Sequence, residues 1–255
     1  CEVAVIEKAF VGERRYWVWV AFLLVLAAAG FVVYYWQWLT GAETSNLSRD
    51  VVWGFFIANY TFLVGVAASA VIVFLPAFTY DDKDLGRLAV LGQFLAVSAV
   101  VMAILFVLVD TGQPSRVLNV VLYPSLSSPF FWDFTALLVY LLLNLAVGFS
   151  ALSAERNFVP PDERPRWLRP LAQLSIVWAV ATVMISSFVF SGLVARPFWN
   201  TAILTPRFIA SALASGPALL IILCLILRAT THFNPGSRAI QKLGTIVLYA
   251  AIANL

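Results

Sequence analysis

Charged residues are scarce in this chain. They make up 11% of its 255 residues, whereas hydrophobic residues make up 62%, and the mean hydropathy is +0.92. A soluble domain usually carries about 25% charged residues. So few charges cannot cover a surface that faces water, and we therefore predict an integral membrane protein. We expect it to contact membrane lipid and to bind no nucleic acid.

Histidine and cysteine are also rare. The two cysteines lie far apart in the sequence, and two cysteines do not make a disulfide framework. A bis-histidine haem needs two ligands, but His232 is the one histidine in the sequence. CxxC, P-loop and GxGxxG motifs are absent from the sequence as well. We expect no haem and no metal to be bound by this chain itself.

Long apolar runs, in contrast, are abundant. A membrane helix needs roughly 20 mostly apolar residues. Because the backbone in hydrocarbon must satisfy its own hydrogen bonds, a helix is the expected form of each run. Six runs qualify and a seventh begins near residue 240; the six are 16–39, 52–79, 88–109, 131–153, 171–193 and 206–228.

The fold class predicted from these runs is all-α. We expect a polytopic membrane helix bundle with six complete transmembrane helices and the start of a seventh, in one integral membrane domain over residues 1–255. The last stretch, "GTIVLYAAIANL", stops inside an apolar run. We therefore expect the chain to be incomplete at its C-terminus.

The positions of Lys and Arg predict the orientation. We call the N-terminal side of the predicted bundle side A, and the side of loops 40–51, 110–130 and 194–205 side B. Side A holds most of the 16 basic residues, and side B holds four: Arg49, Arg116, Arg196 and Arg207. Cytoplasmic loops carry an excess of Lys and Arg. We expect side A, with the N-terminus, in the cytoplasm and side B outside or in the periplasm.

Side B sets its few charges among aromatic residues and prolines. Arg116 ends the stretch "VDTGQPSR", which contains Asp110, and Arg196 and Arg207 lie in "ARPFWNTAILTPRF". An ionisable group near hydrocarbon is costly and usually faces the bundle interior or a partner. These residues either tie loops to helix ends or form a functional site.

Asp133 allows a second structural interpretation. It follows Ser127, Ser128 and Pro129, which are typical of a helix start. Asp133 would then lie in the first turn, where the helix dipole favours an anion. Helix capping and proton handling both remain open for this carboxylate.

Four stretches, taken in order, resemble a known family. They are "SRDVVWGFFIANYTFLVGVAASAV", "LFVLVDTGQPSR", "SSPFFWDFTALLVYLLLNL" and "RPFWNTAILTPRFIASALASGPALLI". Together they are similar to the polysulfide reductase membrane subunit, or NrfD-like, family. Within it, they are most similar to the branch that contains the Dsr complex P subunit and the Hmc complex C subunit.

The resemblance implies a fold and a function. Such proteins are bundles of eight to ten membrane helices in the bacterial or archaeal cytoplasmic membrane, without haem or metal. They exchange electrons between the quinone pool, menaquinone or ubiquinone, and a periplasmic ferredoxin-like iron–sulfur subunit of a respiratory or sulfur-metabolism complex. Further cytochrome or other redox subunits are expected partners. The quinone site is expected near side B, where the iron–sulfur subunit docks.

The same resemblance gives candidate site residues. Asp110 and Asp133 fall in its characteristic stretches as candidates for proton handling. The candidates for quinone binding or partner docking are Asn59, Tyr60, Arg116, Arg196, Trp199 and Arg207. Asn59 and Tyr60 can equally bond a neighbouring helix, which is the more common role of such residues.

Two alternative functions stay open. Gln93 stands where relatives often carry an acid, and "ATVMISSF" stands where they often carry a histidine. Without those groups, the chain is compatible with a structural anchor that holds redox partners at the membrane and turns over no quinone. A small-substrate transporter is the other alternative, although such proteins often contain internal repeats and we find none here.

Overall fold

The described part of the chain consists of helices and the turns that connect them, without strands. The computed structural model describes residues 14–41, 53–69, 83–156, 167–194, 196–230 and 235–255. It divides into two compact units, residues 1–54 and 55–255, and each unit is considered by itself. The prediction of a single domain stays a prediction.

The first unit contains one long helix, α2 (Arg14–Thr40). No residue of α2 is buried, and even Phe31 has 67% of its surface exposed. Its most apolar stretch of 18 residues has a mean hydropathy of 2.3. A helix that is apolar on all sides is typical of a membrane span.

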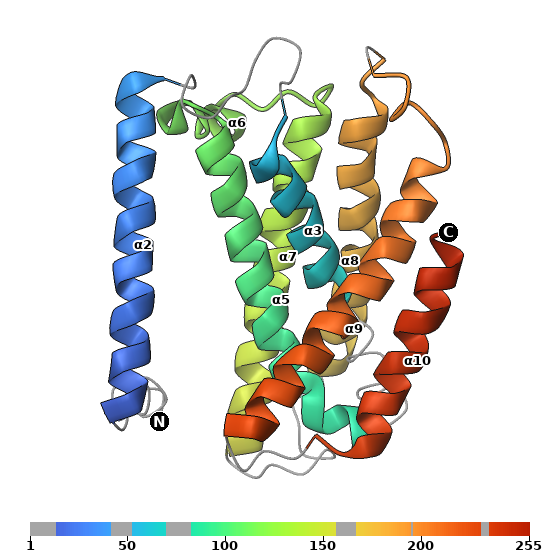
Figure 1. Ribbon diagram of the computed structural model, residues 1–255. Helices are drawn as coiled ribbons and strands as arrows, with labels where there is room; N and C mark the ends of the chain where they lie inside the picture. The colour runs from blue at the N-terminus through green and yellow to red at the C-terminus, as the bar shows by residue number, and fades with distance from the viewer. Residues whose placement is uncertain (1–13, 42–52, 70–82, 157–166, 195, 231–234) are drawn as a thin grey trace. The chain divides into compact units, whose positions relative to one another are not determined.

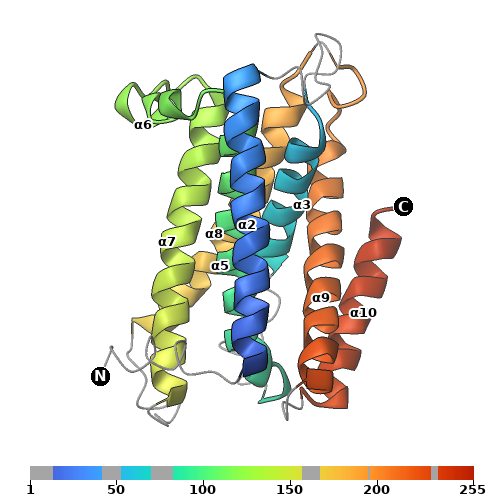
Figure 2. The same ribbon diagram turned by 60° about the vertical axis from the view of Figure 1, so that its left-hand side comes forward.

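The second unit contains the remaining helices, shown in Figure 1. The long ones are α3 (Phe55–Ser69), α5 (Lys83–Asp110), α7 (Pro129–Arg156), α8 (Leu168–Ser191), α9 (Leu204–Thr230) and α10 (Ser237–Ala253). Two short elements, the 3₁₀ helix η3 (Pro114–Arg116) and α6 (Asn119–Leu122), lie between α5 and α7. In both views α9 and α10 run side by side (Figures 1 and 2).

One end of this unit gathers the segments that carry the predicted side-B residues. The α5–α7 connection and the α8–α9 connection both lie at this end, where α3 also begins (Figure 1). We call it the loop end of the unit. The site described below lies in the half of the bundle next to it.

The predicted spans agree with the helices except in the second run. Among the described residues, five helices are long and apolar enough to cross a membrane, and α3 is a shorter apolar helix. The second half of the predicted run 52–79, residues 70–79, lies outside the described residues, as does Arg49. The finding is a multi-pass membrane protein of all-helical fold.

Polar side chains lie inside the second unit, whereas many apolar ones lie on its surface. Large apolar side chains such as Val177 and Phe188 are exposed, as expected of positions that face lipid. Among the residues that the structure describes, the buried polar ones are Ser69, Gln93, Asp133, Asn144, Ser175, Thr182, Ser186 and Ser187. Buried polar groups require hydrogen-bond partners, so these residues help to determine how the helices contact one another.

Helices α3 and α9 approach closely through small residues. A Cβ added to Gly65 would lie 3.3 Å from the Ala212 Cα. A Cβ added to Gly216 would overlap the Ser69 side chain and lie 3.2 Å from the Val66 carbonyl oxygen. Small residues let the backbones of membrane helices come together. Gly65 and Gly216 thus allow α3 and α9 to pack closely.

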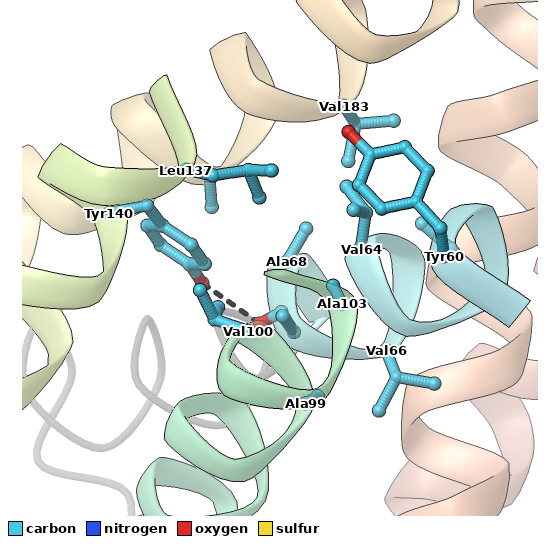
Figure 3. Packing of buried hydrophobic residues seen from close by; sticks show 13 residues of the cluster. Tyr60, Val64, Val66, Ala68, Ala99, Val100, Ala103, Leu137, Tyr140 and Val183 are labelled. Carbon is cyan, nitrogen blue, oxygen red and sulfur yellow. Dashed lines mark hydrogen bonds between the residues drawn. The ribbon is translucent and has the colours of Figure 1, made fainter. Parts of the chain in front are cut away.

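Tyr140 joins α7 to α3 inside the bundle. Its hydroxyl donates a 2.8 Å hydrogen bond to the Ala67 carbonyl, and the ring lies in the apolar cluster that Figure 3 shows. Elsewhere on α7, the Asn144 side-chain oxygen accepts a 2.9 Å hydrogen bond from the Gln93 side chain of α5. These bonds hold α3, α5 and α7 in one register.

Removal of the Tyr140 hydroxyl tests this link. We expect Tyr140→Phe to lower the free energy of unfolding by about 1 kcal/mol, because one interhelical hydrogen bond is lost and the ring remains. The free energy of unfolding is measured by titrating the full-length protein in mild detergent with SDS. Tyr249→Phe is the control, since Tyr249 is 68% exposed. Equal stability of the two variants would contradict the prediction.

Candidate functional site

A buried carboxylate joins three helices near the loop end. Asp133 of α7 is 4% exposed. The Tyr60 hydroxyl of α3 donates a short hydrogen bond to its Oδ2, and the Ser186 hydroxyl of α8 donates to its Oδ1 at 2.5 Å. Figure 3 shows Tyr60 reaching from α3 into the same buried cluster as Val183 of α8.

We call Tyr60, Ser186 and Asp133 the triad; both of its hydroxyl groups donate to the carboxylate. Tyr60 and Ser186 each have one hydroxyl proton, and each donates it to a different oxygen of Asp133. A carboxylate that accepts two donors is satisfied in its charged form. The two hydroxyl oxygens, 3.3 Å apart, keep lone pairs that can accept another proton donor.

Helix capping does not explain Asp133. Helix α7 begins at Pro129, as predicted, but its first turn contains no acidic residue. Asp133 lies one turn later and bonds side chains of α3 and α8. The placement of Asp133 in the first turn was therefore wrong. Because α7 already begins at Pro129, Asp133 falls beyond the first turn, and its side chain points into the bundle.

A cavity of about 360 Å³ opens beside the triad. It lies between α3, α8 and α9, and apolar and aromatic side chains make up most of its lining. Four residues of the lining carry hydroxyl groups: Thr61, Ser186, Ser211 and Ser215. Asp133 borders a separate crevice of about 10 Å³, together with Val117. Ser186 is thus the member of the triad that reaches the cavity.

The α8–α9 connection closes one side of the cavity. Backbone hydrogen bonds from Arg196 to Leu193 and from Trp199 to Arg196 form two successive turns. They bring the Trp199 ring against Phe190, with ring centroids 5.8 Å apart in an edge-to-face arrangement. Both aromatic residues line the cavity. Such a pair gives the cavity a rigid apolar wall.

The structure brings only some of the predicted residues together. Tyr60 bonds Asp133, and Trp199 lines the cavity. The Asn59 amide donates to the Phe55 carbonyl of its own helix at 2.8 Å, and Asn59 is not among the residues that line the cavity. Tyr60 and Trp199 therefore belong to the candidate site, whereas the Asn59 side chain bonds its own helix.

The charged candidates lie toward the loop end. Asp110 is the last residue of α5, and its Oδ1 is buried without a hydrogen-bond partner. Arg116, in η3, is exposed, and no ion pair joins these two described residues. Arg196 and Arg207 are exposed as well. Their predicted roles stay predictions.

Ser186 was not predicted as a site residue. It lies in "ATVMISSF", one position before Ser187, and a serine in an apolar run most often bonds its own helix. Ser187 does so, donating to the Met184 carbonyl at 2.7 Å, and its hydroxyl also lies 2.6 Å from that of Thr205 in α9. The helical spacing of Ser186 with Thr182 and Val183 indicates at most that these residues share one buried face of the helix. It does not indicate Asp133, because that partner lies in another helix.

Comparison with known proteins places the chain in a family. The family model described as "Polysulphide reductase, NrfD" matches residues 43–255. A protein of Halobacterium salinarum described as a membrane subunit of dimethyl sulfoxide reductase is 26% identical, over 90% of this chain and 56% of its own length. The chain is also 22% identical to the C subunit of selenate reductase from Mesobacillus selenatarsenatis, over 88% of this chain and 59% of that protein.

A third relative is named for a quinol. The Hdr-like menaquinol oxidoreductase integral membrane subunit of Archaeoglobus fulgidus is 25% identical, over 86% of this chain and 53% of its own length. The chain spans a little more than half the length of each of these relatives. The match to the family model covers most of the sequence and confirms the resemblance seen in its motifs. This chain therefore belongs to the polysulphide reductase NrfD family of membrane proteins.

Proposed function

We propose that this protein is the quinone-interacting integral membrane subunit of a redox complex of respiratory or sulfur metabolism. It exchanges electrons between the membrane quinone pool and an iron–sulfur subunit. One observation carries the proposal: an apolar cavity of about 360 Å³ whose lining includes Ser186, which is hydrogen-bonded to a buried carboxylate. Ligand pockets are usually about 300–1,000 Å³ and mostly apolar, with a few placed polar groups.

The chemistry of a quinone suits this arrangement. Its reduction takes two electrons and two protons, so the site needs an apolar space for the ring and a group that exchanges protons. The aromatic wall of Phe190 and Trp199 supplies the first, and the triad of Tyr60, Ser186 and Asp133 supplies the second. The name of the Archaeoglobus relative supports quinol as the substrate class.

The proposed partners follow from the loop end. Menaquinone or ubiquinone enters the cavity from the membrane, and a ferredoxin-like iron–sulfur subunit docks over the loop end, where Arg116, Arg196 and Arg207 lie. The excess of basic residues on side A supports a cytoplasmic N-terminus and a periplasmic loop end. We propose the bacterial or archaeal cytoplasmic membrane as its location and further cytochrome or redox subunits as neighbours.

Co-purification tests the proposal and its alternatives. The full-length protein is extracted gently from its native membranes, and the proteins and lipids that accompany it are identified by mass spectrometry. An iron–sulfur protein together with quinone is the expected result. The iron–sulfur protein without quinone would favour a structural anchor, and a protein that purifies with neither would favour a small-substrate transporter.

A second experiment tests the cavity itself. Ala58 lines the cavity, so we expect Ala58→Trp to weaken quinone binding about 10-fold or more, because the indole occupies the space of the ring. Quenching of intrinsic fluorescence by added duroquinone, measured on the purified complex, reports the affinity. The control is Ala146→Trp, which changes an exposed position of α7 outside the cavity lining. Equal affinity of both variants would place the quinone elsewhere.

A further inference from the structure

Asp133 and the cavity do not meet directly. The carboxylate has a crevice of about 10 Å³ on its own side, with Val117 in its lining. The large cavity is lined by α3, α8 and α9, and Ser186 is the triad residue in its lining. Within the triad, Ser186 is therefore the residue that links a ligand in the cavity to Asp133.

The hydrogen-bond directions suit such a transfer. Ser186 donates its proton to Asp133 Oδ1 at 2.5 Å, so its oxygen can only accept from the cavity side. A quinol hydroxyl in the cavity is a donor of the matching kind. Tyr60 donates to the other carboxylate oxygen, which leaves Ser186 the single route from Oδ1 to the cavity within this triad.

We propose that Ser186 relays protons between the quinol and Asp133, an inference that rests on the proposed function. As a quinol O–H bond breaks, its proton goes to Ser186 Oγ and the Ser186 hydroxyl proton goes to Asp133. The quinol loses two electrons, which pass to the iron–sulfur partner, and two protons. Asp133 passes the first proton on to water at the loop end before it accepts the second.

Ser186→Ala tests the relay. The complex containing the full-length chain is assayed for duroquinol oxidation with ferricyanide as the electron acceptor. We expect kcat to fall about 10- to 100-fold, the scale of a lost proton-transfer group, with KM changed less than about threefold. The solvent deuterium isotope effect on kcat should rise, because proton transfer becomes limiting. Ser186→Thr keeps a hydroxyl and should restore most of the rate.

Two other serines serve as matched controls. Ser175 is buried in the same helix and bonds the Ala172 carbonyl at 2.7 Å, so Ser175→Ala should leave both kinetic constants unchanged. Ser211 lines the cavity and is not a member of the triad, so Ser211→Ala should affect KM and not the isotope effect.

The outcomes separate the relay from the proposed function. A Ser186→Ala complex that binds duroquinone and keeps the wild-type kcat and isotope effect would overturn the relay alone. Equal losses in Ser186→Ala and Ser211→Ala would also overturn it, because a general loss of cavity polarity would then explain both. A wild-type complex that neither binds duroquinone nor oxidises duroquinol would overturn the relay and the proposed function together.

Discussion

Replacing Asp133 with asparagine is expected to slow quinol oxidation by about 100-fold or more, while the complex still binds quinone. The side chain keeps its size, but an amide takes up no proton at the pH of the assay. An amide also has one acceptor oxygen, whereas the carboxylate accepts from both Tyr60 and Ser186. The duroquinol–ferricyanide assay measures the rate, and fluorescence quenching by duroquinone measures binding.

Tyr60→Phe separates proton transfer from helix contact. It removes one donor to Asp133 but leaves the carboxylate and the Ser186 bond in place. We expect less than about a tenfold loss of kcat, together with a modest loss of stability from the missing hydrogen bond. If Asp133→Asn kept the wild-type kcat, or if Tyr60→Phe lost as much activity, Asp133 would have no proton-transfer role.

Gly216→Ala is expected to lower the free energy of unfolding by about 1–3 kcal/mol, the usual cost of overpacking a close contact. The new methyl group would overlap Ser69 and lie 3.2 Å from the Val66 carbonyl oxygen. Ser69 cannot simply rotate away, because its hydroxyl donates a 2.6 Å hydrogen bond to that carbonyl. Titration with SDS of the full-length protein in mild detergent measures the effect.

Two further variants make this prediction specific. Nothing lies within 4 Å of a Cβ added to Gly244, so Gly244→Ala should be neutral or stabilising by up to about 1 kcal/mol. The double variant Gly216→Ala with Ser69→Gly removes the side chain that the new methyl group overlaps, and it should recover much of the loss. Similar stability of Gly216→Ala and Gly244→Ala would show that α3 and α9 do not meet at this point.

The amino-acid sequence determines the helices because membrane helices depend on local properties. An apolar run of about 20 residues must bond its own backbone in hydrocarbon, whatever its neighbours are. The predicted runs 88–109, 131–153, 171–193 and 206–228 accordingly correspond to α5, α7, α8 and α9. The four quoted motifs likewise sufficed to indicate the family, since their order along the chain can be read without any structure.

Contacts between distant residues, such as Tyr60 and Asp133, cannot be predicted in this way. Each could be selected from the sequence as a polar residue near a helix end, but 73 positions separate them. Nothing in the sequence indicates that they bond each other and not their own helices. From the sequence alone, Asp133 was equally compatible with helix capping. In the fold, its side chain instead points toward α3 and α8.

Only the tertiary structure decided the composition of the site. Ser186 lies 53 positions from Asp133, whereas its serine neighbour Ser187 bonds its own helix and Thr205 of α9. Which of two adjacent serines faces a carboxylate depends on the rotation of α8 within the bundle, and that rotation depends on how the helices around it pack. The cavity has the same origin, because it is the space that three helices leave between them. Local hydrophobicity therefore determined the helices, whereas packing between distant segments determined which side chains meet.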